Sequence, residues 1–280
     1  MFVYGALQYD RPFLASLFAC KALHPVGVTR KLPLCALVVL RWLRGRLRKR
    51  RSRPLRRWAT IDGATLRVDA KAEGLAVAVG GRAPHFAENG QVDVGRSRWF
   101  SVRPTEQDAP WAFVGGRPAR AISTLELLAT TLGHVLLAPA QLDAPGAAGT
   151  VAATGLTDNQ FSAAVVTRGL NTSFPLCTVA MELPAQLEAR GAELFLSWIP
   201  RKANREAGRL ADGRWEGFDE KLRVHTNLSE VNWLDLNDLL KAGQAFYAEG
   251  RRADGGEKQA RAVERGVAGK RRKLREREPW

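Results

Sequence analysis

The order of secondary-structure signals between residues 58 and 213 limits this chain to one class of fold. Three short β-like runs separated by turn residues come first, and a segment with a Ser/Thr start signal and leucines at helical spacing follows them. A strand, two helices, a strand and a last helix come next. Because this order does not repeat βαβ units, it predicts a mixed sheet with flanking helices. The predicted strands are 65–69, 75–79, 99–102, 149–157 and 192–199, and the predicted helices are 122–137, 159–168, 183–190 and 202–210.

Segments of different composition flank this central region. In the first of them, apolar residues at three- and four-residue steps predict an amphipathic helix over Cys35–Leu47. Past Gly213, only residues 233–247 have a helical pattern, and 250–280 are charged and poor in apolar residues, which is typical of a chain that is disordered or becomes helical only when bound. We therefore predict a basic segment at 1–57, an α/β domain at 58–213, a helical extension at 214–249 and a charged tail at 250–280.

The positive charge is concentrated near the start of the chain. The whole sequence has 43 Lys and Arg residues against 28 Asp and Glu, a net charge of +15. Residues 1–57 hold 14 basic residues and 1 acidic residue, whereas 58–213 are close to neutral. A globular protein this basic commonly binds a polyanion, so nucleic acid is the favoured partner and the basic helix is expected to lie along its phosphates. A solvated basic surface or a nuclear-targeting run is the alternative interpretation of this segment.

Cysteine count, hydropathy and motif content exclude several other classes. The three cysteines are odd in number and widely spaced, so they indicate neither a disulfide framework nor a zinc knuckle. No P-loop, GxGxxG or HExxH motif occurs. The longest apolar run, Leu34–Leu40, is shorter than the roughly 20 residues of a membrane span, and the N-terminus lacks a signal-peptide pattern. We therefore expect an intracellular protein, cytoplasmic or nuclear, with no membrane segment.

Three acidic residues occur where packing alone would not place them. Asp69 and Asp158 each end a predicted strand, and Glu126 lies among leucines close to the apolar face of the helix 122–137. Brought together, three carboxylates would bind Mg²⁺ or Mn²⁺, and two such ions about 3.5–4 Å apart can promote phosphodiester hydrolysis. Each residue also has an ordinary role, since strand-end Asp residues form turns and helical Glu residues are usually exposed. The residues themselves leave both interpretations open.

The order and context of these acids resemble the RNase H domain of retroelement reverse transcriptases of the gypsy-like or DIRS-like kind. The resemblance covers about residues 58–213, and Tyr9–Phe18 looks like the connection segment that follows the polymerase thumb in such proteins. No Tyr-x-Asp-Asp polymerase motif occurs in this sequence, so the resemblance implies a fragment without a polymerase active site. It also implies an RNase H-like five-stranded mixed sheet with flanking helices, plus basic helical N-terminal and C-terminal extensions. The four ordered motifs that carry the resemblance are Leu66–Ala70, Ile122–Ala129, Leu156–Asn159 and Leu196–Asn204.

By this resemblance, Asp69, Glu126 and Asp158 would be catalytic metal ligands, with Mg²⁺ or Mn²⁺ as the cofactor and water as the nucleophile. The implied activity is hydrolysis of the RNA strand of RNA·DNA hybrids by two-metal catalysis. The implied partners are an RNA·DNA hybrid or other nucleic acid, and the polymerase part of the same polyprotein. The residues expected to contact nucleic acid are Lys71, Asn159, Arg201 and Asn204.

The fourth motif departs from the family pattern Asn-x-x-Ala-Asp-x-Leu. Asn204, Ala207 and Leu210 match it, but Gly208 stands where the pattern has Asp. Asp212, four residues further on and about 6 Å along a continued helix, is the candidate fourth catalytic and metal-binding carboxylate. Because this departure removes a ligand, a catalytically decayed remnant that still binds nucleic acid is the alternative to an active nuclease. A different nuclease or an integrase of the same fold is a third interpretation.

Overall fold

One mixed sheet of five strands organises the molecule. The computed structural model describes residues 10–23, 32–49, 58–74, 76–89, 91–137, 150–169, 171, 173–190 and 192–243. Within these residues the strand order is β3-β2-β1-β4-β5. The pairs β1–β2 and β2–β3 are antiparallel, whereas β4 is parallel to both β1 and β5. This is the RNase H-like α/β fold that the sequence predicts. The strands are β1 (Trp58–Glu73), β2 (Ala76–Phe86), β3 (Val92–Val102), β4 (Thr150–Thr157) and β5 (Ala192–Trp198).

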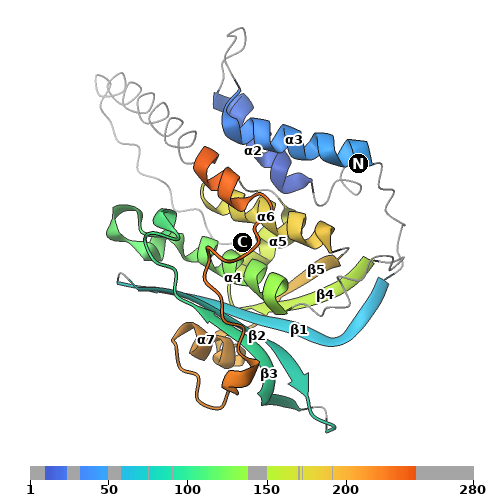
Figure 1. The fold of residues 1–280 in the computed structure, drawn as a ribbon, viewed down its shortest axis with the longest axis vertical. Helices are drawn as coiled ribbons and strands as arrows, with labels where there is room; N and C mark the ends of the chain where they lie inside the picture. The colour runs from blue at the N-terminus through green and yellow to red at the C-terminus, as the bar shows by residue number, and fades with distance from the viewer. Residues whose placement is uncertain are drawn as a thin grey trace, which may run out of the picture.

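Helices cover both faces of the sheet (Figure 1). One face carries α4 (Ile122–Leu137), α5 (Gln160–Arg168) and α6 (Leu176–Ala189), and the other carries α7 (Arg205–Ala211). Two N-terminal helices, α2 (Arg11–Leu23) and α3 (Leu34–Lys49), lie on the outer side of α6. The helix predicted over Cys35–Leu47 is therefore confirmed as α3. None of the described helices is both long and apolar enough to cross a bilayer.

Two glycines let the helices on opposite faces approach the central strands closely. A Cβ on Gly133 of α4 would lie 2.9 Å from Cγ1 of Val68, so α4 packs directly on β1. A Cβ on Gly80 of β2 would lie 2.7 Å from the backbone nitrogen of Ala211, so α7 packs equally closely on the other face. Since Gly80 is the register partner of Asp69, both helices come near this acid.

The first three strands are longer than the sequence predicts. Pairing with β4 begins at Trp58, and pairing with β2 continues to Glu73, well beyond the predicted run 65–69. Asp69 therefore lies inside β1, and its predicted position at a strand end is wrong. The apolar alternation is short, but backbone pairing on both sides extends the strand. Asp158 does follow the last residue of its strand, as predicted.

Between residues 58 and 213 the described α-helices follow the predicted number and order, whereas α2 near the N-terminus was not predicted. The leucine-rich helix α4 spans the predicted residues 122–137. In contrast, α6 begins seven residues before the predicted start, and Pro184 lies inside it. Helix α7 begins at Arg205 because residues 201–203 form a separate 3-10 turn. The predicted helix 233–247 begins at residue 236, and its end and the tail 250–280 lie outside the described residues.

The chain beyond residue 213 packs on the domain. Leu228, Val231 and Leu236 belong to the same apolar core as α4 and α6. The backbone N–H of Val224 donates to the carbonyl of Trp99 at 2.7 Å, which adds a bridge to the outer edge of β3. The division at residue 213 stays a prediction, but residues 214–243 contribute to the folded core.

A buried carboxylate holds the end of this extension in place. Glu182 of α6 is fully buried, and its oxygens accept hydrogen bonds from the backbone N–H groups of residues 234–236 at 2.8–2.9 Å. The side-chain amide of Gln186 donates to the same carboxylate at 2.7 Å. Glu182 thus caps the helix that begins at residue 236, although 54 residues separate the two in the sequence.

Candidate metal centre

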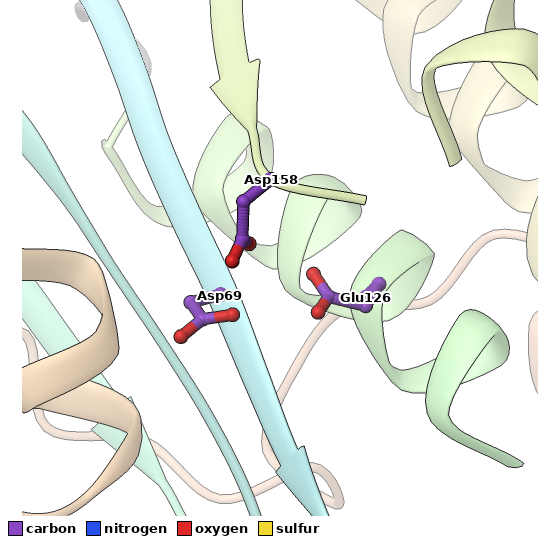
Figure 2. A group of neighbouring side chains, drawn as sticks. All are labelled: Asp69, Glu126 and Asp158. Atoms are coloured by element: carbon purple, nitrogen blue, oxygen red, sulfur yellow. The ribbon is translucent and has the colours of Figure 1, made fainter. Parts of the chain in front are cut away.

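Three acids from three different elements converge at one point (Figure 2). Asp69 comes from β1, Glu126 from α4, and Asp158 follows β4. Each offers one carboxylate oxygen to a cluster whose atoms all lie within 4.8 Å of one another. Asp69 and Glu126 are buried, and Asp158 is partly buried. The structure thus brings together the three acids that the sequence singles out.

Burial and mutual repulsion keep protons on this cluster in the absence of a cation. Burial, together with the charge of Asp158, raises the pKa of Asp69 to about 7. Burial, together with the charges of Asp69 and Asp158, raises the pKa of Glu126 to about 9. Three carboxylates this close cannot all ionise without a counter-charge. A bound cation would supply that charge and displace the protons.

The donor set fits a hard divalent cation. All three side chains offer oxygen, which Mg²⁺ and Mn²⁺ prefer. Oxygens held about 2.1 Å from one Mg²⁺ lie roughly 3 to 4 Å apart, close to the spacing of this cluster. In addition, Oε2 of Glu126 is buried without a hydrogen-bond partner among the described residues. A buried acceptor of this kind is costly unless an ion or water satisfies it. The residues present therefore fit a metal ion.

The cluster opens into a hollow that reaches the surface. Its volume is about 570 Å³, and Lys71, Asn159 and Arg201 line it together with the three acids. Nε of Arg201 lies 3.9 Å from Oδ2 of Asp158, and the Arg201 side chain is 88% exposed. Asn159 caps α5, because its side chain accepts a hydrogen bond from the backbone N–H of Ser162. Three of the four predicted nucleic-acid contacts thus lie in the wall of the hollow.

Asp212, the predicted fourth carboxylate, lies outside the acidic cluster. Oδ1 of Asp212 lies 2.8 Å from Nζ of Lys71, and Arg214 donates to the other oxygen. Partial burial acts to raise the pKa of Asp212, but the hydrogen bonds from Lys71 and Arg214 outweigh it and hold the pKa below its ordinary value. Since α7 ends at Ala211, Asp212 follows the helix and faces these cations instead of the acids.

Position 208 does face the cluster. A Cβ built on Gly208 would lie 3.1 Å from Oδ2 of Asp69. The fourth position of the family pattern is therefore at the site, but glycine supplies no ligand there.

Asn204 lies beneath the surface of the site. The residue is only 2% exposed and its side chain makes hydrogen bonds inside the domain, so its contact with nucleic acid stays a prediction. Nδ2 donates to the carbonyl of Val68 at 2.9 Å and to Oδ1 of Asp158 at 3.4 Å. One amide therefore ties Asp158 to the strand that carries Asp69. No direct signal in the amino-acid sequence marks this role, because Asn204 is recognisable only as the start of the fourth motif.

Comparisons with known proteins give structural similarities but no match to a protein family or a curated protein. Among solved structures, RNase H1 from the halophilic archaeon Halobacterium salinarum NRC-1 is similar, with 16% identity over 56% of this chain and 97% of that chain and a TM-score of 0.34. The N-terminal RNase H domain of Rv2228c from Mycobacterium tuberculosis, solved as a fusion with maltose-binding protein, has 18% identity over 54% and 91% of the two chains and a TM-score of 0.30. The RNase H-like assignment of the fold rests on the strand order and pairing given above.

Proposed function

We propose that this chain is a metal-dependent RNase H-type endonuclease that hydrolyses the RNA strand of RNA·DNA hybrids. The observation that supports this most directly is the convergence of Asp69, Glu126 and Asp158 in an open hollow on an RNase H-like sheet. Carboxylates grouped in this way suit phosphodiester hydrolysis, because bound Mg²⁺ or Mn²⁺ would lower the pKa of water and stabilise negative charge on the phosphate.

Each residue of the site has a distinct role in the proposed reaction. Asp69, Glu126 and Asp158 would hold the cations, and the first two release protons as they do so. Asn204 keeps the carboxylate of Asp158 in place through its hydrogen bond. The exposed guanidinium of Arg201, beside Asp158, is placed to pair with a substrate phosphate.

The narrower part of the proposal concerns origin and partners. Four motifs in the order found here resemble the RNase H domain of retroelement reverse transcriptases, and two helices, α2 and α3, precede the domain where a connection-like segment is expected. We infer from this an RNA·DNA hybrid as substrate and the polymerase part of the same polyprotein as a partner.

A second function, binding of nucleic acid without cleavage, is favoured by one observation. Gly208 faces Oδ2 of Asp69 at the position where the family pattern has a carboxylate. With one ligand fewer, the site would hold a second cation weakly. The chain would then bind hybrids through its basic residues and cleave them slowly or not at all.

Cleavage of a hybrid whose RNA strand carries an end label separates the two functions. The wild-type chain is compared with Asp69→Asn, which keeps the size of the side chain and removes its charge, in Mg²⁺, in Mn²⁺ and in EDTA. An RNase H-type nuclease shortens the RNA strand only in the wild type and only with a metal ion. Binding of the hybrid by both proteins, without cleavage above the Asn variant in either metal, would leave the non-catalytic function.

A further inference from the structure

Helix α3 presents a row of arginines on its outward face. Arg41, Arg44 and Arg48 are all exposed and follow one another at steps of three and four residues, so they lie on the same side of the helix. The seven residue steps from Arg41 to Arg48 correspond to about 10.5 Å along the helix axis. We call these three residues the α3 arginine row.

The charge of the α3 arginine row is not neutralised within the described part of the chain. The sequence has no acidic residue from position 11 to position 57. Among the residues that the structure describes, the three guanidinium groups form no ion pair. In contrast, Lys71 beside the acidic hollow is paired with Glu73 and Asp212. Within the described residues, the α3 arginine row therefore carries positive charge that no acidic side chain pairs with.

The opposite face of α3 fixes this row to the domain. The rings of Trp42 and Phe13 are stacked, with centroids 3.7 Å apart, and join α3 to α2. Val38 and Val39 belong to a buried cluster with Met181 of α6. Figure 1 shows α3 beyond α6, on the side away from the sheet. The α3 arginine row and the acidic hollow thus belong to different parts of the surface.

We propose that the α3 arginine row is a second nucleic-acid-binding surface, which contacts phosphates at a distance from the acidic hollow. A duplex carries about one charge per 1.7 Å of its axis, so the 10.5 Å of the row faces roughly six phosphate charges. Arginine suits this role because its planar guanidinium pairs with phosphate through two hydrogen bonds. Such contacts are independent of base sequence, and they hold a long nucleic acid near the hollow between cleavage events. Only the choice of an RNA·DNA hybrid as ligand rests on the proposed function.

The experiment measures binding without catalysis. The triple variant R41Q/R44Q/R48Q is compared with the wild type for binding a hybrid of about 30 base pairs in EDTA, over a range of about 50 to 200 mM salt. Each lost phosphate contact lowers the slope of log Kd against log salt concentration by about 0.9, so we expect the slope to fall by 2 to 3. The wild-type loss of affinity across this salt range should then exceed that of the variant by about 40-fold.

A matched variant controls for net charge. R96Q/R168Q/K221Q removes three exposed positive charges from β3, α5 and the turn 220–222. If the α3 arginine row binds phosphates, this variant keeps the wild-type slope. Equal slopes in all three proteins, or an equal fall in both variants, would overturn the proposal. Circular dichroism and the thermal unfolding midpoint show whether the variants are folded.

Two further measurements distinguish nucleic-acid binding by α3 from membrane binding and from the proposed nuclease activity. Leu37 and Leu40 are 38% and 41% exposed beside the row, which is a pattern that an anionic membrane would also fit. Binding to vesicles containing phosphatidylserine that the α3 substitutions abolish, with hybrid binding unchanged, would overturn the proposal in favour of a lipid surface. Failure of the wild type to cleave RNA would refute the proposed activity but would leave the binding slopes, and hence this proposal, intact.

Discussion

Replacing Gly208 with Asp tests whether the departure in the fourth motif weakens the metal centre. A Cβ at this position would lie 3.1 Å from Oδ2 of Asp69, so the two carboxylates would lie about 4 Å apart. At an effective dielectric constant of about 20, two unit charges at that distance interact by about 4 kcal/mol. In EDTA at about pH 8, we expect Gly208→Asp to lower the free energy of unfolding by up to this amount. With a divalent cation bound, the substitution should instead raise the free energy of unfolding, because the added carboxylate attracts the cation.

Chemical denaturation in EDTA and in Mg²⁺ measures both effects. Gly208→Asn is the matched control, because it adds nearly the same volume without charge. The Asp variant should be less stable than the Asn variant in EDTA, should gain more stability from Mg²⁺, and should cleave the hybrid faster than the wild type. If the two variants unfold alike in EDTA and respond equally to Mg²⁺, the side chain at 208 does not face Asp69 and the geometric reasoning is refuted.

Three other predictions concern the acids and their support. Glu126→Gln should stabilise the metal-free chain at about pH 8 by several kcal/mol, because each pH unit of pKa displacement corresponds to about 1.4 kcal/mol. The same substitution should abolish stabilisation by Mg²⁺. Thermal unfolding with and without Mg²⁺ measures both effects. In EDTA, the stability of the wild type should fall as pH rises from about 4 to about 9, because folded Asp69 and Glu126 have pKa values of about 7 and about 9 and retain protons that the unfolded chain releases. Urea titrations that show rising stability over this range would contradict the assignment. Asn204→Ala should weaken Mg²⁺ binding about tenfold or more, measured by calorimetry, and an unchanged affinity would show that Asn204 does not position Asp158.

Local patterns predict the parts of this fold that depend on local interactions. The bounds of α4 could be predicted because the leucine spacing and the Ser/Thr start signal that indicate them both lie within the helix itself. The extent of β1 does not follow from its own residues, because pairing with β2 and β4 determines where it ends. For the same reason the position of Asp69 inside the strand was not predictable. The acidic cluster was predictable only through the resemblance of the ordered motifs to RNase H domains, which implies that Asp69, Glu126 and Asp158 are metal ligands; the residues themselves left that question open.

The directions of individual side chains depend on contacts that are distant in the sequence. The end of α7 at Ala211 lies within one residue of the predicted end, but nothing local indicates that Lys71 of β1 lies beside Asp212 and pairs with it. Glu126 and Glu182 illustrate the same limit, since each is a buried acid on a largely apolar helix. Glu182 is satisfied by backbone N–H groups some 50 residues away, whereas Oε2 of Glu126 has no described partner. Only the three-dimensional arrangement distinguishes a structural carboxylate from a metal ligand.

The cap that Glu182 provides has a practical consequence for the design of shortened expression fragments. A fragment that stops at residue 213 would lose the three backbone N–H groups that hydrogen-bond to Glu182, so this carboxylate would have to be satisfied by Gln186 and water. It would also remove Leu228, Val231 and Leu236 from the apolar core and expose the hydrophobic side chains that they cover. The smallest fragment worth purifying therefore extends to at least residue 243.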